Sequence, residues 1–260
     1  MKSNIEKYVY VGFRVIVLSV LIRQLFIGNW NSAFLCVLTL FLFLIPNFLE
    51  KRLNVSLPIV LEITILIFIF SAEILGEISN FYGTFKQWDT ILHTVNGFLA
   101  AAIGFSLIDI INQRNLFHIS MSPWFVALVA FCFSMTIGVL WEFFEFAGDQ
   151  LFNKDMQKDR IIQKLSSVDL NPERKNVPVI IENIDHTVIY YQDGDQMKTE
   201  LVEGGYLDIG IIDTMKDLIV NFVGAVTFSV FGFLYITRRD KFQFVDDFIP
   251  KLNEKTVPDK

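Results

Sequence analysis

The feature that most constrains the fold of this chain is an uncharged apolar run from Pro123 to Leu140. As a helix, a run of about 18 residues is long enough to cross the hydrocarbon core of a bilayer. Five other stretches are comparably apolar. They cover residues 8–28, 32–49, 58–78, 89–111 and 211–236. The sequence therefore predicts an all-α polytopic membrane protein with six transmembrane helices.

Composition supports this class of protein. The chain has 260 residues, of which 53% are hydrophobic and only 19% are charged, and its mean hydropathy is +0.46. A soluble domain carries more charge and less apolar surface. Both cysteines, Cys36 and Cys132, fall inside apolar runs, where cysteine acts as a small hydrophobe. No disulfide and no metal site are therefore predicted from them.

The first apolar run resembles a signal peptide, since Lys2 and Lys7 precede it. However, it contains Arg14 and Arg23 and lacks a small-x-small cleavage site. We therefore expect an uncleaved first span.

The charge pattern divides the chain into four parts. Residues 1–149 hold the first five spans, residues 150–210 form an insertion with the composition of a soluble segment, residues 211–237 hold the sixth span, and residues 238–260 form a tail. Within the insertion, residues 150–168 are expected to form an amphipathic surface helix. Short strands are expected at 177–184, 187–191 and 197–202, with a turn at Asp193-Gly194. The insertion is therefore predicted to be a small β-containing cap.

Six spans place both termini on one side of the membrane. The short connections on that side carry Lys51, Arg52 and Arg114, whereas those on the other side carry only Lys86. Because Lys and Arg in short loops favour the cytoplasm, both termini are predicted to be cytoplasmic. The protein is then expected to reside in a bacterial plasma membrane, with the cap insertion outside.

Three spans carry stripes of polar residues near their predicted outer ends. Offsets of three and seven put Glu142, Glu145 and Asp149 on one helical face. The fourth and sixth spans carry similar stripes, made of Asp89, His93 and Asn96 on one and Asp213, Asp217 and Asn221 on the other. Ionisable groups at membrane depth are costly, so they usually face a protein interior or a water-filled cavity. Emergence of the fifth span into water at Glu142 is the simpler alternative.

These stripes supply the candidate site. His93, Glu142 and Asp217 are predicted to act as catalytic residues or metal ligands. The predicted supporting residues are Asp89, Asn96, Glu145, Asp149, Asp213 and Asn221. One histidine with several carboxylates suits Mg²⁺, Mn²⁺ or Zn²⁺, and it equally suits a metal-free general acid and base. A divalent cation is therefore possible, and the cofactor stays open.

Small residues accompany each stripe: Gly97, Gly138 and Gly224. Such residues allow close approach of membrane helices, so spans four, five and six are predicted to enclose one cavity. The isolated histidines His118 and His186 are expected to lie on the surface. No nucleotide motif and no nucleic-acid surface are visible in the sequence.

The motifs also resemble known families. The set includes Trp88-Asp89-x-x-x-His93-x-x-x-Gly97, Trp141-Glu142-x-x-Glu145-x-x-x-Asp149, Met156-Gln157 and Asp213-Thr214-Met215-x-Asp217 continuing to Asn221 and Gly224-Ala225. It resembles the YjdF-type bacterial membrane proteins, a family of unassigned function. More remotely, it is similar to the VanZ-like proteins, although Thr90 stands where that family has Lys.

Three functional interpretations compete. The first is a membrane enzyme, a hydrolase or transferase acting from the outer face on an envelope or lipid-linked substrate. The second is a carrier or cation pathway, for which Glu62 and Arg14 are the candidates for a continuation beyond Asn221. The third is a binding, resistance or structural protein whose acids brace helix ends or hold an ion.

Overall fold

The computed structural model describes residues 4–113, 121–173 and 175–253. The chain divides into two compact units. The helical unit comprises Met1–Val139 and Asp217–Lys260, and the cap unit comprises Leu140–Lys216. His118 and Arg114, which entered the sequence predictions, lie outside the described residues.

Among the described residues, six helices are long and apolar enough to cross a membrane, which confirms the predicted fold class. Two of the six spans are composite. The helices and their continuations are α1 (Asn4–Phe26), α2 (Trp30–Leu42) with α3 (Ile45–Leu53), α4 (Ile59–Phe70) with the π-helix η1 (Ser71–Ile78), α6 (Trp88–Gln113), α7 (Pro123–Phe152) and α8 (Ile211–Thr237).

Local chemistry explains several helix ends. The Ser122 Oγ accepts the Phe125 N–H at 3.3 Å, so Ser122 caps α7 with Pro123 at its first position. The second span breaks into α2 and α3 just before Pro46, which lies in the first turn of α3, because proline cannot supply an N–H inside a helix.

A short connection leads from η1 into α6. It contains the one-turn helix α5 (Phe81–Thr84). The Tyr82 ring lies so close to Gly76 that a Cβ at that position would collide with it. The Trp88 Nε1 donates a hydrogen bond to the Ser71 carbonyl at 3.3 Å. These contacts hold the start of α6 against η1.

The helical unit contains two apolar cores. One lies between α1, α2, α4 and η1 and is built on Val17, Cys36, Phe43 and Leu66, all fully buried. The other joins α6, α7 and α8 and contains Phe105, Phe228 and several alanines. The alanines fit the small-residue packing expected of membrane helices.

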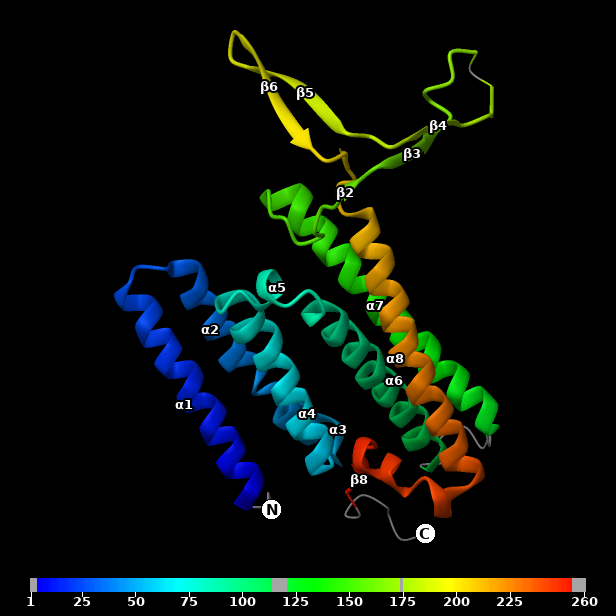
Figure 1. Ribbon diagram of the computed structural model, residues 1–260. Helices are drawn as coiled ribbons and strands as arrows, with labels where there is room; N and C mark the ends of the chain where they lie inside the picture. The colour runs from blue at the N-terminus through cyan, green and yellow to red at the C-terminus, as the bar shows by residue number, and fades with distance from the viewer. Residues whose placement is uncertain (1–3, 114–120, 174, 254–260) are drawn as a thin grey trace. The chain divides into compact units, whose positions relative to one another are not determined.

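The described part of the C-terminal tail belongs to this second core. Val245 and Ile249 in the tail are 0% and 3% exposed. The tail forms the short 3-10 helices η2 (Arg239–Lys241) and η3 (Gln243–Phe248), and its strand β8 (Lys251–Leu252) pairs with β1 (Val55–Ser56). The beginning of α1 and strand β8 lie at the same end of this unit (Figure 1), as an even number of spans requires.

The cap unit contains three two-stranded antiparallel pairs, which confirms the predicted strand-containing insertion. The pairs are β2 (Ile161–Ile162) with β7 (Tyr206–Leu207), β3 (Lys164–Ser167) with β4 (Val179–Glu182), and β5 (His186–Asp193) with β6 (Gln196–Glu203). Asp193 pairs with Gln196 across the predicted turn, where Gly194 adopts φ +61. Glycine adopts this left-handed conformation without a steric penalty.

The amphipathic helix predicted for residues 150–168 is wrong. Helix α7 ends at Phe152, Asn153 adopts a left-handed φ of 49, and residues 161–167 contain β2 and β3. The Asp149 carboxylate accepts the N–H groups of Met156 and Gln157 at 2.6 and 2.9 Å. Because these side-chain bonds replace the N–H to carbonyl bonds of a helix, the backbone turns away from the helical path.

Candidate metal centre

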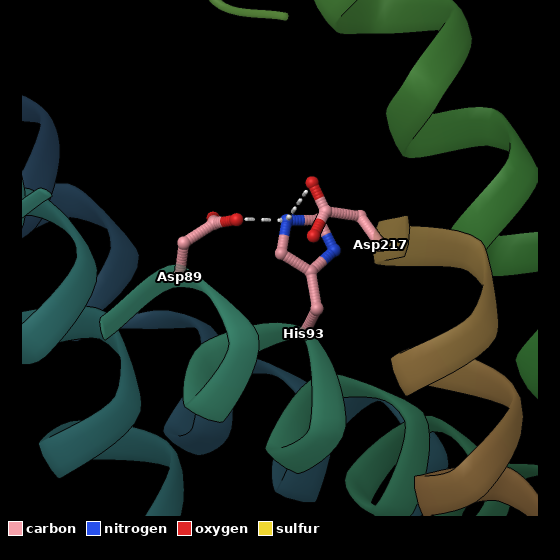
Figure 2. A group of neighbouring side chains, drawn as sticks. All are labelled: Asp89, His93 and Asp217. Atoms are coloured by element: carbon pink, nitrogen blue, oxygen red, sulfur yellow. Dashed lines mark ion pairs between the residues drawn. The ribbon is translucent and has the colours of Figure 1, made fainter. Parts of the chain in front are cut away.

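Helices α6 and α8 bring together three of the predicted site residues. Asp89 and His93 are one turn apart on α6, and Asp217 lies in the second turn of α8. The His93 Nε2 is 3.4 Å from the Asp89 Oδ1 and 3.9 Å from the Asp217 Oδ2. One ligand atom from each residue lies within 4.8 Å of the other two. Figure 2 shows both carboxylates turned toward the same edge of the imidazole ring.

The spacing of these three atoms suits a shared cation. Both separations from the His93 Nε2 are longer than the usual 2.7–3.2 Å of an N–H to oxygen hydrogen bond. Ligands about 2.0–2.1 Å from a tetrahedral ion are about 3.3 Å from one another. Small rotations of the side chains would therefore place all three atoms on one ion. We call Asp89, His93 and Asp217 the triad.

The electrostatics of the triad also favour a cation. The side chains of Asp89, His93 and Asp217 are 29%, 11% and 2% exposed. Two ionised carboxylates this close together repel, and water screens the deeper one poorly. A divalent cation would cancel their charge, whereas the exposed edge at Asp89 leaves a route for a further ligand.

A second polar layer lies one turn beyond the triad. The Asn96 Nδ2 donates a hydrogen bond to the Asn221 Oδ1 at 3.3 Å, and Asn221 is only 1% exposed. The Ser134 Oγ on α7 donates to the Gly97 carbonyl at 2.7 Å. This layer joins α6, α7 and α8 immediately beneath the triad.

Glycines make this close approach possible. A Cβ at Gly97 would collide with the Asn221 backbone, and a Cβ at Gly224 would collide with the Thr94 carbonyl. Gly138 leaves room for the Asn221 side chain. The predicted role of these three glycines is therefore consistent with the contacts observed.

Aromatic rings follow the asparagine layer. The Phe98 ring packs edge to face against Phe228 at 5.0 Å and against Phe248 of the tail at 5.2 Å, and Phe105 lies 6.0 Å from Phe228. Phe105 and Phe228 are fully buried. The interior between α6, α8 and the tail is thus apolar directly beyond the polar residues.

The acids of α7 belong to the cap unit. Glu142 and Glu145 are 4% and 8% exposed, whereas Phe143, Phe144 and Phe146 are 55–63% exposed. The predicted shared face of the acids is therefore the buried face of this helix. The Trp141 Nε1 donates to the Glu145 Oε1 at 2.8 Å, so Trp141 orients that carboxylate.

Asp149 and Asp213 hold the backbone of the cap. Besides the two bonds to Asp149, the Lys158 N–H donates to the Asp213 Oδ2 at 3.0 Å, and the Arg160 guanidinium lies 3.2 Å from the Asp213 Oδ1. The Gln157 Nε2 donates to the Thr214 Oγ1 at 2.5 Å. Residues 156–160 are therefore fixed to the ends of α7 and α8 by two acids that were predicted as supporting site residues.

Asp208 completes the base of the cap and was not predicted. Burial alone would raise the pKa of this carboxyl group, but its bonds from the N–H groups of Arg160, Ile212 and Gly210 lower the pKa below its ordinary value. Those bonds are 2.8, 3.0 and 3.2 Å long. Nearby, burial and the charges of Asp155, Asp208 and Asp149 raise the pKa of Asp159.

Sequence reasoning missed two further contacts. One is the ion pair of Arg160 with Asp213, two residues that are far apart in the sequence. The Tyr10 hydroxyl donates to the Glu62 Oε1 at 2.6 Å, and Glu62 is 1% exposed. Arg14 lies over the Tyr10 ring at 5.4 Å. Tyr10 thus gives the buried Glu62 a partner on α1.

His186 is exposed on the cap, as predicted, with its Nδ1 3.0 Å from the Asp185 Oδ2.

The six spans and the triad define a multi-pass membrane protein that carries a mostly buried histidine and carboxylate cluster. The chain belongs to the family described as "Predicted membrane protein (DUF2238)", which matches residues 7–238. It is also similar to an uncharacterized protein of Thermotoga maritima, with 27% identity over 106 residues. That match covers 41% of this chain and 53% of the relative, so the chain spans about half the length of this curated relative. No solved structure matches the chain.

Proposed function

We propose that this protein is a membrane enzyme in which Asp89, His93 and Asp217 hold a divalent cation. The observation that carries the proposal is the convergence of one imidazole nitrogen and two carboxylate oxygens within 4.8 Å at the ends of two membrane-spanning helices. With three protein ligands, a cation keeps an open position, as in catalytic rather than structural sites. The proposed reaction class is a hydrolysis or group transfer on an envelope or lipid-linked substrate.

The candidate residues would have different roles in the reaction. When bound, the cation would act as a Lewis acid or lower the pKa of a bound water. Asp217 is the most buried ligand and fixes one side of the site, while Asp89 is the most exposed and lies where a substrate enters. Asn221 and Asn96 position the helices that carry these ligands. Glu142 stays our predicted acid or base, on the strength of its burial and its place in the α7 stripe.

The carrier alternative is less well supported. A carrier needs polar groups on both sides of its central site, yet Phe98, Phe105 and Phe228 follow Asn221 on one side. Glu62, a candidate for the continuation, is held by Tyr10 on α1. A pathway from the triad through these residues would have to cross the aromatic layer.

A structural brace accounts for some acids better than for others. Asp213 pairs with Arg160, and Asp149 accepts two backbone bonds, which is what a brace requires. In the triad, one ligand atom from each of three residues lies within 4.8 Å of the other two, as a shared cation requires. We therefore assign the brace to the cap base and the cation to the triad.

The outward orientation is part of the proposal and rests on the distribution of Lys and Arg. On that orientation the triad faces the outer side of a bacterial plasma membrane. The resemblance to YjdF-type and VanZ-like proteins is consistent with a role in the cell envelope, and it suggests no particular reaction.

The experiment is a titration of purified protein with Mn²⁺, followed by the loss of the free-ion electron spin resonance signal. Wild type is expected to bind one ion per chain, whereas Asp217→Asn and His93→Ala should bind at least about tenfold more weakly because each lacks one ligand. Asp247→Asn removes an exposed carboxylate of the tail and should bind as wild type does. Equal binding by all four proteins would overturn the proposal.

A parallel assay addresses the role of Glu142. Glu142→Gln should abolish the cellular phenotype of the protein while retaining Mn²⁺ binding, if Glu142 is the acid or base and not a ligand. Loss of stability in Glu142→Gln with the phenotype intact would instead make this residue structural.

A further inference from the structure

We propose that the ligand completing the triad is a phosphoryl group carried by a membrane lipid. The inference rests on the proposed cation at Asp89, His93 and Asp217, and it names the class of substrate that the centre is built to receive. Three features of the helical unit carry it: the charge of the site, its depth, and the surface around its open edge.

The charge of the site selects an anion that donates oxygen. A bound divalent cation would offset the negative charge that the Asp89 and Asp217 carboxylates carry when ionised. An anionic ligand can then approach without net repulsion, whereas the metal-free centre repels it. Phosphoryl oxygens are hard ligands that suit Mg²⁺ and Mn²⁺, which commonly bind substrate phosphates through one or two protein carboxylates.

The place of the triad at the end of a candidate span points to the level of the lipid phosphates. Asp89 is the second residue of a membrane-spanning helix, and His93 is one turn further in. The N-terminal end of α6 also carries a partial positive charge, which favours an anion. A phosphate at the bilayer surface can therefore reach the open edge of the triad without entering the hydrocarbon core.

Aromatic residues precede Asp89 in the chain. The Phe81 ring lies 4.8 Å from Phe85 and 4.9 Å from Trp88, and the Phe85 and Trp88 rings are 6.4 Å apart. Aromatic side chains are typical of the membrane interface. We call Phe81, Phe85 and Trp88 the aromatic rim. Trp88 directly precedes Asp89, and Phe81 and Phe85 lie in the connection from η1 to α6.

The rim is open to an acyl chain. The Phe85 and Ile91 side chains are 51% and 52% exposed, and they flank Trp88 and Asp89 in sequence. A lipid could therefore keep its chain against these residues while its head group reaches the triad. The apolar layer of Phe98, Phe105 and Phe228 closes the interior beyond Asn221, so the ligand enters from this edge.

The same phosphoryl chemistry is available from a water-soluble phosphate ester, and the depth of the site distinguishes the two sources. An alkyl chain concentrates its head group at the surface of a micelle or bilayer, because each buried CH₂ favours the apolar phase. A site that opens at this surface gains from that concentration. A site that opens into bulk water does not.

The experiment uses the full chain in maltoside micelles, which contain no phosphate, loaded with substoichiometric Mn²⁺. Paramagnetic broadening of ³¹P resonances is measured for three probes: dodecyl phosphate, methyl phosphate and inorganic phosphate. Dodecyl phosphate should be broadened at least roughly tenfold more than the soluble probes at equal total concentration. Asp217→Asn should abolish the effect, and the exposed control Asp247→Asn should retain it.

The outcomes separate this inference from the proposed function. If Mn²⁺ binds and no probe is broadened, the phosphoryl ligand is wrong and the metal centre stands. If Mn²⁺ binds and the soluble probes are broadened as strongly as dodecyl phosphate, the lipid source is wrong. If Mn²⁺ does not bind, both proposals fall.

A rim variant tests the lipid contact separately. Phe85→Ala removes an exposed ring that holds no ligand atom, so Mn²⁺ affinity and broadening of methyl phosphate should match wild type. The preference for dodecyl phosphate should fall at least about twofold as apolar contact is lost. An unchanged preference would show that the rim does not contact the chain.

Discussion

The acids near the ends of α6, α7 and α8 differ in the groups that are seen around them. Asp213 is paired with Arg160, and Asp149 and Asp208 accept backbone N–H groups. The triad instead sets two carboxylates against one imidazole nitrogen. Acids of similar sequence context thus divide into structural and candidate ligand groups by the geometry around them.

Asn221 provides a residue-scale prediction. Asn221→Ala removes the acceptor of the Asn96 bond in a site that is 1% exposed. The change deletes a buried amide and leaves the half-buried Asn96 amide without this acceptor, which costs about 1–3 kcal/mol, so the free energy of unfolding should fall by that amount. Denaturation in mixed micelles measures it, with the exposed Thr136→Ala as control. An unchanged stability would show that the asparagine layer does not hold α6 against α8.

At the scale of elements, the triad depends on close contact between α6 and α8. Gly97→Ala and Gly224→Ala each place a methyl group against backbone of the other helix. Backbone cannot move aside as a flexible side chain can, so each variant should lose about 1–3 kcal/mol of stability and weaken Mn²⁺ binding. Gly12→Ala is the matched control, because nothing lies within 4 Å of the added methyl group on α1. Equal losses in all three variants would contradict this packing.

The base of the cap should respond to acid. The folded-state pKa of Asp208 is lowered by its N–H donors, so its contribution to stability is complete above the unfolded pKa of about 3.9 and is lost as pH falls through the folded value. Hydrogen-exchange protection of the Arg160, Gly210 and Ile212 amides, corrected for intrinsic rates, should therefore drop below about pH 4. Asp208→Asn should lose most of this pH dependence. Protection that stays constant into strong acid would contradict the assignment.

At the scale of the whole molecule, hydropathy was enough to predict six spans, because crossing a bilayer needs long apolar runs. The helix expected at 150–168 does not form, because the Met156 and Gln157 N–H groups donate to the Asp149 carboxylate instead of to helix carbonyls. Hydrophobic periodicity does not reveal such side-chain bonds. The burial of Val245 and Ile249 was also not predicted from the sequence, since a short irregular segment has no periodic hydrophobic pattern. At the site, the spacing of Asp89 and His93 predicted a shared face, and the glycines predicted close helix packing. The distances from His93 to Asp217 depend on how α6 packs on α8, which residue spacing does not determine.

Topology is the prediction at this scale. With Cys36 and Cys132 replaced by Ala, a single Cys at the exposed Asp193 in the β5–β6 turn should react with an impermeant thiol reagent in intact cells. The positive-inside distribution of Lys and Arg is the reason. A single Cys at Asp247 in the tail should react only after lysis. The reverse pattern would place the triad on the cytoplasmic side.

The central claim is that His93 ligates a cation together with Asp89 and Asp217. Electron spin echo modulation of Mn²⁺ bound to the purified protein detects a directly coordinated imidazole nitrogen. Wild type should show a nitrogen coupling that persists in His186→Ala, whose histidine is exposed on the cap, and disappears in His93→Ala. Bound Mn²⁺ without nitrogen coupling, or a coupling that survives in His93→Ala, would contradict it.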